Sequence, residues 1–202
     1  YDGQPLTKNE HDDFTVTGDL PEGFTWAATA DGTVTNVVPS EGEKAVNAIT
    51  SFIIYNAEGE DVTDQFANID TSATATLTIT ARPVTLTSGN ASKEYDGAAL
   101  TNADVEGKNA NGLTVETGWV AGEGATYVFS GTITEVGEED NAYEYTLKEN
   151  TIATNYNITK NVGKLTITES SEEIVVTPAG GTKVYDGQPL TKNEHDDFTV
   201  TG

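Results

Sequence analysis

Short runs in which apolar and polar residues alternate are the main pattern along the chain. Tyr143, Tyr145 and Leu147 alternate with polar residues, and the Leu-Thr-Ile-Thr runs at 77–80 and 165–168 show the same alternation. Such runs indicate half-buried β-strands, because successive side chains of a strand point to opposite faces of the sheet. No segment of about ten residues keeps the apolar spacing of three and four that predicts an amphipathic helix. The pattern therefore predicts an all-β protein.

Turn residues separate these runs at short intervals, as at Asp31-Gly32, Glu58-Gly59 and residues 122–124. Short strands that recur roughly every 8–12 residues favour small sandwiches. We therefore expect two small tandem β-sandwich modules of the immunoglobulin-like type, arranged as a rod. The alternative is a pair of β-grasp-like modules. A β-grasp needs a helix packed across its sheet, and the only candidate is a single turn at residues 61–66.

Internal repetition divides the chain. Residues 1–18 and 185–202 are identical, and Tyr-Asp-Gly occurs at residues 1, 95 and 185. Self-similarity at a regular period identifies tandem modules. We expect a first β module at residues 1–82, whose leading strand residues would lie upstream of residue 1. A second module is expected at 83–172, and the start of a third, a copy of the first, at 173–202. The connections near Pro83 and at 169–173 are short, which favours an extended arrangement.

The chain is strongly acidic, with 33 Asp and Glu against 10 Lys and Arg, and a formal net charge of −23. The first 92 residues carry 14 acids and 3 bases, and residues 93–182 carry 15 acids and 5 bases, so the acidity belongs to each module. Such a balance argues against nucleic acid as a partner, because nucleic-acid binding needs Lys and Arg. No apolar run approaches the ~20 residues of a membrane span, so no membrane insertion is expected.

The absence of Cys excludes disulfides and thiolate sites. The chain begins with Tyr rather than Met, so we expect it to be a fragment or a processed product.

Several anchor sequences resemble a known repeat family. They are Lys-Glu-Tyr-Asp-Gly at 93–97, residues 122–127, residues 154–158, and Gly-Lys-Leu-Thr-Ile-Thr at 163–168. Together they are similar to the MBG/YDG-type tandem repeats of large bacterial cell-surface adhesins. The first module departs from the pattern at residues 26–49 and lacks the Gly before its Leu-Thr-Ile-Thr run. The resemblance implies an extracellular location on the bacterial surface, anchored to a Gram-positive cell wall, and it implies no catalytic residue.

The Tyr-Asp-Gly tripeptides are expected to form structural turns. Gly adopts positive φ at no steric cost, Asp hydrogen-bonds the backbone two residues on, and Tyr buries its ring while its hydroxyl stays at the wet edge. A ligand contact through Tyr is the alternative. The residues concerned are Tyr1, Asp2, Gly3, Tyr95, Asp96, Gly97, Tyr185, Asp186 and Gly187.

Carboxylate clusters offer a candidate calcium site. Ca²⁺ takes 6–8 oxygen ligands, and Asp12, Asp13, Glu139 and Asp140 lie in the acidic clusters that could supply some of them. None of the clusters has the spacing of an EF-hand loop. A solvated acidic face is the alternative, so no cofactor is expected beyond this possible Ca²⁺. His11 lies beside the first cluster and could join it.

Two tryptophans are candidates for stacking on a glycan, Trp26 in the first module and Trp119 in the second. A core position is the alternative for both. A Lys–Asn or Lys–Asp isopeptide would need a Lys buried among apolar residues, and Lys8, Lys44, Lys148 and Lys164 lie in other contexts. A tandem module of about 90 residues leaves little room for a catalytic cleft, and the second module has no His, so no enzymatic activity is expected.

These observations predict a structural stalk or fibre repeat that projects an adhesive tip from a bacterial cell, with neighbouring repeats of the same chain as partners. The first alternative is that the repeats themselves bind host glycan or mucin by multivalency. The further alternative is a strand-exchange polymer, in which residues 183–202 of one copy complete the first module of the next.

Overall fold

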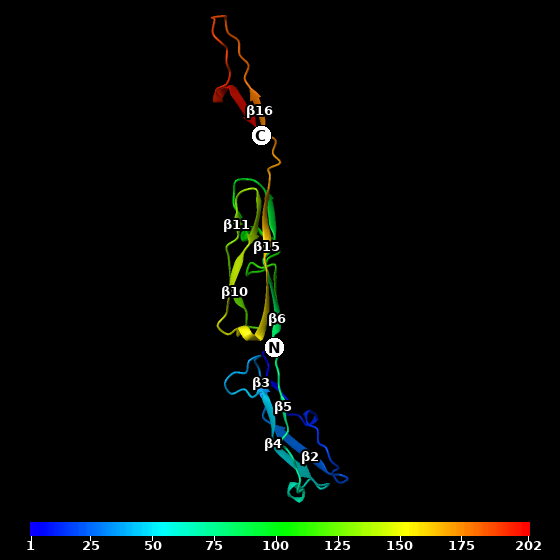
Figure 1. Cartoon of the computed structure of the whole chain (residues 1–202). Helices are drawn as coiled ribbons and strands as arrows, with labels where there is room; N and C mark the ends of the chain where they lie inside the picture. Colours follow the sequence, from blue (N-terminus) through cyan, green and yellow to red (C-terminus); the bar gives the residue numbers. More distant parts are fainter.

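The computed structural model describes residues 1–202 as an elongated all-β molecule (Figure 1). The strands form several small sheets, and none of them closes into a barrel. The helical elements are five 3₁₀ turns of three residues each. The prediction of an all-β protein is confirmed, and no helix crosses a sheet as a β-grasp would require.

The strands fall into three groups, and no β-ladder connects one group with another. We keep the names first module, second module and third segment for residues 1–82, 83–172 and 173–202; these boundaries stay predictions. The first group comprises β1 (Leu6–Thr7), β2 (Thr25–Ala30), β3 (Thr33–Val34), β4 (Val46–Tyr55) and β5 (Thr74–Thr76), with the 3₁₀ turns η1 (His11–Asp13) and η2 (Thr63–Gln65).

The second group begins at the joint with β6 and ends at β15. It comprises β6 (Arg82–Thr87), β7 (Ala91–Glu94), β8 (Leu100–Thr101), β9 (Val115–Thr117), β10 (Ala125–Phe129), β11 (Thr132–Ile133), β12 (Gly137–Asn141), β13 (Tyr143–Leu147), β14 (Tyr156–Asn161) and β15 (Gly163–Thr168), with η3 (Asn102–Asp104) and η4 (Ala153–Asn155). The third segment contains β16 (Val175–Pro178), η5 (His195–Asp197) and β17 (Phe198–Thr201).

The two modules share a pairing scheme. In the first, β1 pairs with β3, and β4 lies between β2 and β5, all antiparallel. In the second, β8 pairs with β11, β10 pairs with β13, and β12 pairs with β15, and these pairs are antiparallel as well. Corresponding pairs include Leu6 with Val34 and Leu100 with Ile133. This shared pairing scheme includes residues 26–49, although the sequence of the first module differs from the repeat pattern there.

One strand distinguishes the two modules. In the second module, β6 lies between β14, to which it is parallel, and β9, to which it is antiparallel. When the Tyr-Asp-Gly sequences are superimposed, the residues equivalent to β6 precede Tyr1. The segments of the first module at 14–17 and 66–71 occupy the positions of β9 and β14, and neither has a ladder partner. Gly18 and Gly118 follow the corresponding segments with similar positive φ, +111° and +103°, which supports this correspondence.

The two modules differ in the number of apolar side chains that they bury. Val84 and Leu86 of β6 are buried against Leu113, Tyr143 and Tyr156. Leu100, Val105, Leu165 and Ile167 form a second buried cluster of the same module. The buried apolar residues of the first module are limited to Val34, Ile54 and Leu77.

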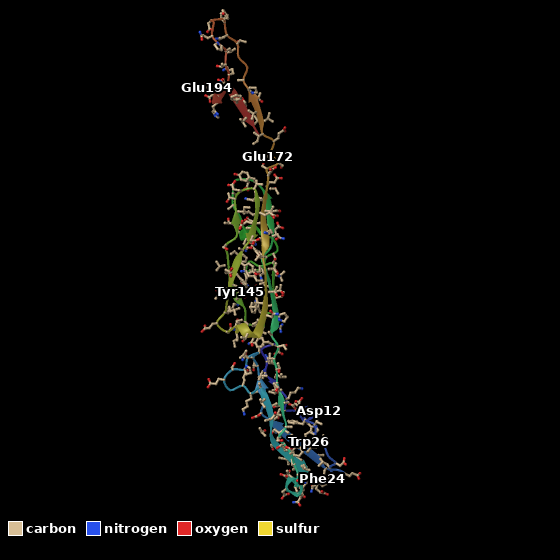
Figure 2. All side chains as sticks on the ribbon, viewed as in Figure 1. Asp12, Phe24, Trp26, Tyr145, Glu172 and Glu194 are labelled. Atoms are coloured by element: carbon tan, nitrogen blue, oxygen red, sulfur yellow. The ribbon has the colours of Figure 1, made fainter.

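The third segment lies beyond the second module (Figure 1), and its residues are exposed except for the partly buried Asp197. Its β16 is antiparallel to β17, with Val175 opposite Thr201. Ile174 is 71% exposed and Val176 is 58% exposed. Glu172 lies in the stretch that connects this segment to the second module (Figure 2).

We expect the first module to unfold at a lower urea concentration than the second, because it buries fewer apolar side chains. Trp26 and Trp119 report on the two modules separately, so the Trp119→Phe and Trp26→Phe variants each leave one reporter. Fluorescence titrations of these variants should give midpoints that differ by about 1 M, given slopes of 1–3 kcal/mol per M for small domains. Coincident midpoints would contradict the expectation.

Candidate functional site

Side chains of the first and second modules meet directly at the joint between them. The N-terminus lies at this joint (Figure 1). The Tyr1 hydroxyl donates to Glu123 Oε1 at 2.6 Å, and the Tyr1 ring meets that of Tyr156 edge-on, with 5.4 Å between centroids. The Tyr156 hydroxyl donates to Glu123 Oε2 at 2.9 Å and accepts from the Val120 amide at 3.2 Å. One carboxylate therefore holds a phenol from each module.

Asn155 forms a second link across the joint. It ends η4, and its side chain is fully buried, with 0% exposure. Its Oδ1 accepts from the Val37 amide at 2.9 Å, and its Nδ2 donates to Asn36 Oδ1 at 2.7 Å. An amide side chain supplies both a donor and an acceptor, so one residue satisfies two groups of the facing loop.

The loop that meets Asn155 is ordered by Glu43. Its carboxylate accepts hydrogen bonds from the Ser40 amide at 2.7 Å and from the Thr35 amide at 2.7 Å. The Ser40 amide is the main cause of the lowered pKa of Glu43, and the Thr35 amide acts in the same direction against the effect of burial. Asn36 and Val37, which contact the second module, therefore belong to a loop whose conformation is held by Glu43 of the first module.

The covalent connection between the two modules is short, and hydrogen bonds fix the residues on both sides of it. The Tyr1 ammonium donates to Thr80 O at 2.6 Å, and Arg82 Nε donates to Gly118 O at 2.6 Å. A single residue, Ala81, separates the two anchored positions, and Pro83 fixes its own φ and keeps Arg82 extended. The joint therefore has little free chain through which it could bend.

The phenols of the joint are protected from ionisation. Burial is the main cause that raises the pKa of Tyr156 to about 12, and the nearby Glu123 carboxylate adds to the shift. Burial and the hydrogen bond to Glu123 raise the pKa of Tyr1 as well. Both groups therefore remain neutral donors to Glu123 at physiological pH.

The three Tyr-Asp-Gly turns have the same local geometry. Gly3, Gly97 and Gly187 have φ of +79°, +76° and +76°, in the region that Gly adopts without strain. In each turn the Asp Oδ1 accepts from the amide two residues on, at 2.9 Å for Asp2 and Asp96 and 3.0 Å for Asp186.

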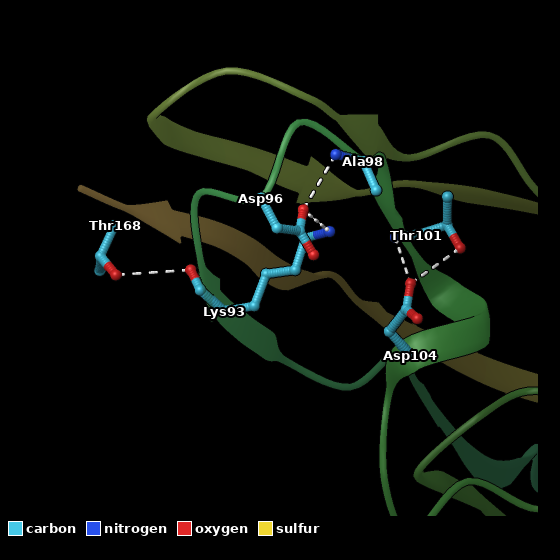
Figure 3. Close-up of polar contacts among 6 residues, drawn as sticks. All are labelled: Lys93, Asp96, Ala98, Thr101, Asp104 and Thr168. Atoms are coloured by element: carbon cyan, nitrogen blue, oxygen red, sulfur yellow. Dashed lines mark hydrogen bonds and ion pairs between the residues drawn. The ribbon is translucent and has the colours of Figure 1, made fainter. Parts of the chain in front are cut away.

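Lys93 reinforces the turn at Asp96 (Figure 3). Lys93 Nζ lies 2.7 Å from Asp96 Oδ1, and Thr168 Oγ1 donates to Lys93 O at 3.4 Å. Tyr1 is the tyrosine of this motif that contacts the next module, whereas Tyr95 is 41% exposed and Tyr185 is 91% exposed.

The two tryptophans occupy non-equivalent positions. Trp26 lies on β2 (Figure 2). The His11 ring stacks on it at 4.0 Å between centroids, and the centroid of the Phe52 ring lies 6.1 Å away. Trp119 follows β9 and meets the Tyr156 ring edge-on at 4.8 Å. Both side chains are partly buried among aromatic neighbours.

The calcium candidates lie apart. Asp12 and Asp13 belong to η1 of the first module, whereas Glu139 and Asp140 lie on β12 of the second. Asp13 Oδ1 is 2.8 Å from Lys8 Nζ, and Asp140 Oδ1 is 2.8 Å from Lys164 Nζ. No group of three or more His, Asp or Glu side chains is placed to hold a metal ion.

The lysines considered for an isopeptide lie at the surface. Lys8, Lys44 and Lys164 form ion pairs with Asp13, Asp31 and Asp140, and all three lysine side chains are more than half exposed. Lys148 lies on an exposed turn near Gly124. None of these four side chains has the apolar surroundings that the reaction needs.

Apart from Tyr1, the residues that form the joint are ones that the sequence does not single out as functional. Asn155 and Tyr156 lie in the Thr-Asn-Tyr-Asn-Ile anchor at 154–158, which indicates the repeat family and not a contact. Asn36 lies 119 residues away from its partner Asn155, so no local pattern connects the two.

No protein-family model, curated protein or solved structure matches the chain. The resemblance to MBG/YDG-type repeats therefore stays a prediction. None of the helices is long and apolar enough to span a membrane.

We expect the Asn155→Ala variant to loosen the joint, because it removes two hydrogen bonds between the modules, each worth ~1 kcal/mol. Residual dipolar couplings should report one common alignment for both modules in the parent chain and two different alignments in the variant. Asn150→Ala is the matched control, since it removes one hydrogen bond to Gly122 within the second module. Equal behaviour of the two variants would contradict the assignment of the joint.

We also expect a late step in the alkaline titration of the phenols. Tyr143 and Tyr156 have pKa values of about 12 in the fold, against 10.0 ordinarily, and burial is the main cause in both. A group whose pKa is raised on folding stabilises the fold fully below its ordinary pKa and loses that effect as the pH rises through the folded value. The chain should therefore lose stability between about pH 10 and pH 12.

Absorbance at 295 nm measures this titration directly. The Tyr156→Phe variant should lose the amplitude of one of the 8 tyrosines, and the loss should fall in the late step. A loss confined to the step near pH 10 would show that Tyr156 is not protected.

Proposed function

We propose that this chain is a spacer of a bacterial surface stalk, in which modules are joined end to end at a fixed angle. The joint carries the proposal: Asn155 and Glu123 bind groups of the preceding module directly. A protein whose role is to hold a distal part away from its anchor needs such joints, because each free hinge shortens the mean extension of the whole chain.

The resemblance to MBG/YDG-type repeats supports the same function and an extracellular location on the cell wall of a Gram-positive bacterium. Neighbouring repeats of the same chain are the partners under this proposal. We also propose that each module is a small sandwich of the immunoglobulin-like type. In support, Val84 and Leu86 of the β14-β6-β9 sheet pack against Tyr143, Tyr127 and Phe129 of the β10-β13 pair.

The net charge of the modules suits this role. Residues 1–92 and 93–182 each carry a large excess of acids, which disfavours collapse of one module onto another and aggregation between chains. All seven ion pairs between Lys and a carboxylate lie within a module or within the third segment, and none of them crosses the joint. Neutral amides and phenols carry much of the contact, so it should depend little on ionic strength.

The alternative, glycan or mucin binding by the repeats, is not favoured by a specific observation. Trp26 has one face covered by His11, and Trp119 packs on Tyr156. A glycan array probed with the chain distinguishes the two functions, because the stalk predicts no binding. Trp26→Ala and Trp119→Ala variants would identify the responsible module if binding occurred.

A display experiment tests the stalk directly. One, two or four copies of the chain are inserted between a cell-surface anchor and a small tagged tip, and the height of the tip is measured by atomic force microscopy. We expect equal increments of height per copy, and smaller increments with Asn155→Ala in every copy. Asn150→Ala serves again as the control, and a height that does not increase with copy number would contradict the proposal.

A further inference from the structure

Two segments of the second module run side by side and in the same direction along the module. They are residues 82–94, which contain β6 and β7, and residues 156–168, which contain β14 and β15. Six residue pairs join β6 to β14 and four join β7 to β15, and both ladders are parallel. The two segments together are called the clamp below.

The two ladders of the clamp have the same register. Arg82 pairs with Tyr156 at the start and Glu94 pairs with Thr168 at the end, and the partners of both pairs are 74 residues apart in the sequence. The register is therefore kept while both segments pass from one sheet to the other. A slip at either ladder would break the register of the whole clamp.

Side chains continue the pairing through the corner between β6 and β7. Ser88 Oγ accepts a hydrogen bond from the Gly163 amide at 2.9 Å, and Asn90 Oδ1 accepts one from the Lys164 amide at 2.7 Å. Gly163 lies so close to Gly89 that a Cβ would collide with the Gly89 carbonyl oxygen. The two main chains therefore stay in contact where the regular ladder is interrupted.

Buried side chains fix each segment to the rest of the module. Val84 and Leu86 of β6 belong to one apolar cluster, and Leu165 and Ile167 of β15 belong to the other. Hydrogen bonds that apolar side chains shield from water are electrostatically stronger than exposed ones. Each ladder of the clamp therefore contains one strand that is shielded in this way.

The clamp lies in the path of a pull along the rod. The chain enters the second module at Arg82, beside the first module, and the last strand of the module ends at Thr168, toward the third segment (Figure 1). A pull on these neighbours draws residues 82–94 toward the first module and residues 156–168 toward the third segment. Because the two segments are parallel, this pull slides one along the other and loads the bonds of both ladders together.

We propose that the second module bears tension along the rod, and that the clamp resists this tension through shear of its two parallel ladders. The inference goes beyond the proposed stalk, because a spacer needs length and stiffness but not resistance to a pull. Tension arises when a distal part is held while the anchor moves, and the module must then stay folded. Forced unfolding is governed by the unfolding rate, which falls when many bonds must break in one step.

Two directions of pulling test the clamp, and the absence of Cys allows each attachment point to be chosen. The shear variant, Ala81→Cys with Glu169→Cys, is pulled from opposite ends of the clamp. The peeling variant, Ala81→Cys with Ala153→Cys, is pulled at the beginnings of β6 and β14, which lie at one end, so their pairs separate one after another. All three positions are exposed, and handles attached to the cysteines in optical tweezers load only the second module.

We expect the shear variant to unfold at a force at least twofold higher than the peeling variant at the same pulling speed, since the six pairs of β6 and β14 break together and not singly. The released length identifies each event. It is at most about 300 Å in the shear variant and about 250 Å in the peeling variant, at 3.3–3.6 Å per residue. Equal forces in the two directions, or a lower force in shear, overturn the proposal.

A side chain at the corner supplies a second test. Asn90→Ala in the shear variant removes the acceptor of the Lys164 amide, so the unfolding rate at constant force should rise about fivefold, as expected for one hydrogen bond. Asn150→Ala is the matched control, because it removes one hydrogen bond to Gly122 outside the clamp and should leave that rate nearly unchanged. Equal unfolding rates of the two substituted chains under force contradict the proposal.

Failure of the clamp and failure of the stalk give different results. A chain that yields equally in both directions but raises a displayed tip by equal increments per copy is a spacer that bears no load. A chain that resists shear but does not raise the tip keeps the clamp and contradicts the stalk.

Discussion

The pairing of β6 with strands on both of its edges is the constraint on which most of this structure depends. Its main chain joins β14 and β9 into one sheet, and its apolar face buries Val84 and Leu86. The second module, which includes this strand, has ten buried apolar residues, and residues 1–82 have three. Leu113, Tyr143 and Tyr156 are buried together with the two β6 residues. A central strand of this kind therefore completes the sheet with its main chain and closes the apolar face with its side chains.

The joint is held by hydrogen bonds and aromatic contacts, whereas the cores are held by the burial of apolar side chains. Two modules with a large excess of acids repel each other, and the screening length of about 8 Å at physiological salt does not remove that repulsion across a direct contact. The contact is nevertheless built largely from groups without net charge: the amides of Asn155 and Asn36 and the phenols of Tyr1 and Tyr156. Glu123 is the exception, and its two phenol donors stabilise its carboxylate without adding a counter-charge. Repulsion thus favours the extended shape while short-range hydrogen bonds fix its angle.

The sequence predicts the local features and misses those that depend on distant residues. Alternation of side chains indicates an all-β fold because each strand carries its own period. The Tyr-Asp-Gly tripeptides predict turns in the same way, through the conformational freedom of Gly and the hydrogen bond of Asp. The contact between Asn36 and Asn155 could not be predicted, because the two are recognisable as partners only when the modules are placed end to end. Trp26 and Trp119 are both named by the sequence as candidates, but their different neighbours, His11 and Tyr156, come from distant residues and could not be predicted.

The two connections of the chain are held to different degrees. At the first, Ala81 alone separates Thr80, which accepts from the Tyr1 ammonium, from Arg82, which donates to Gly118 O. At the second, residues 169–173 are held through the hydrogen bonds of Ser171 to Glu94. Because the second connection has fewer contacts, bending is expected there rather than at the joint between the first and second modules. The extension of such a chain therefore depends on how many connections of each kind it contains.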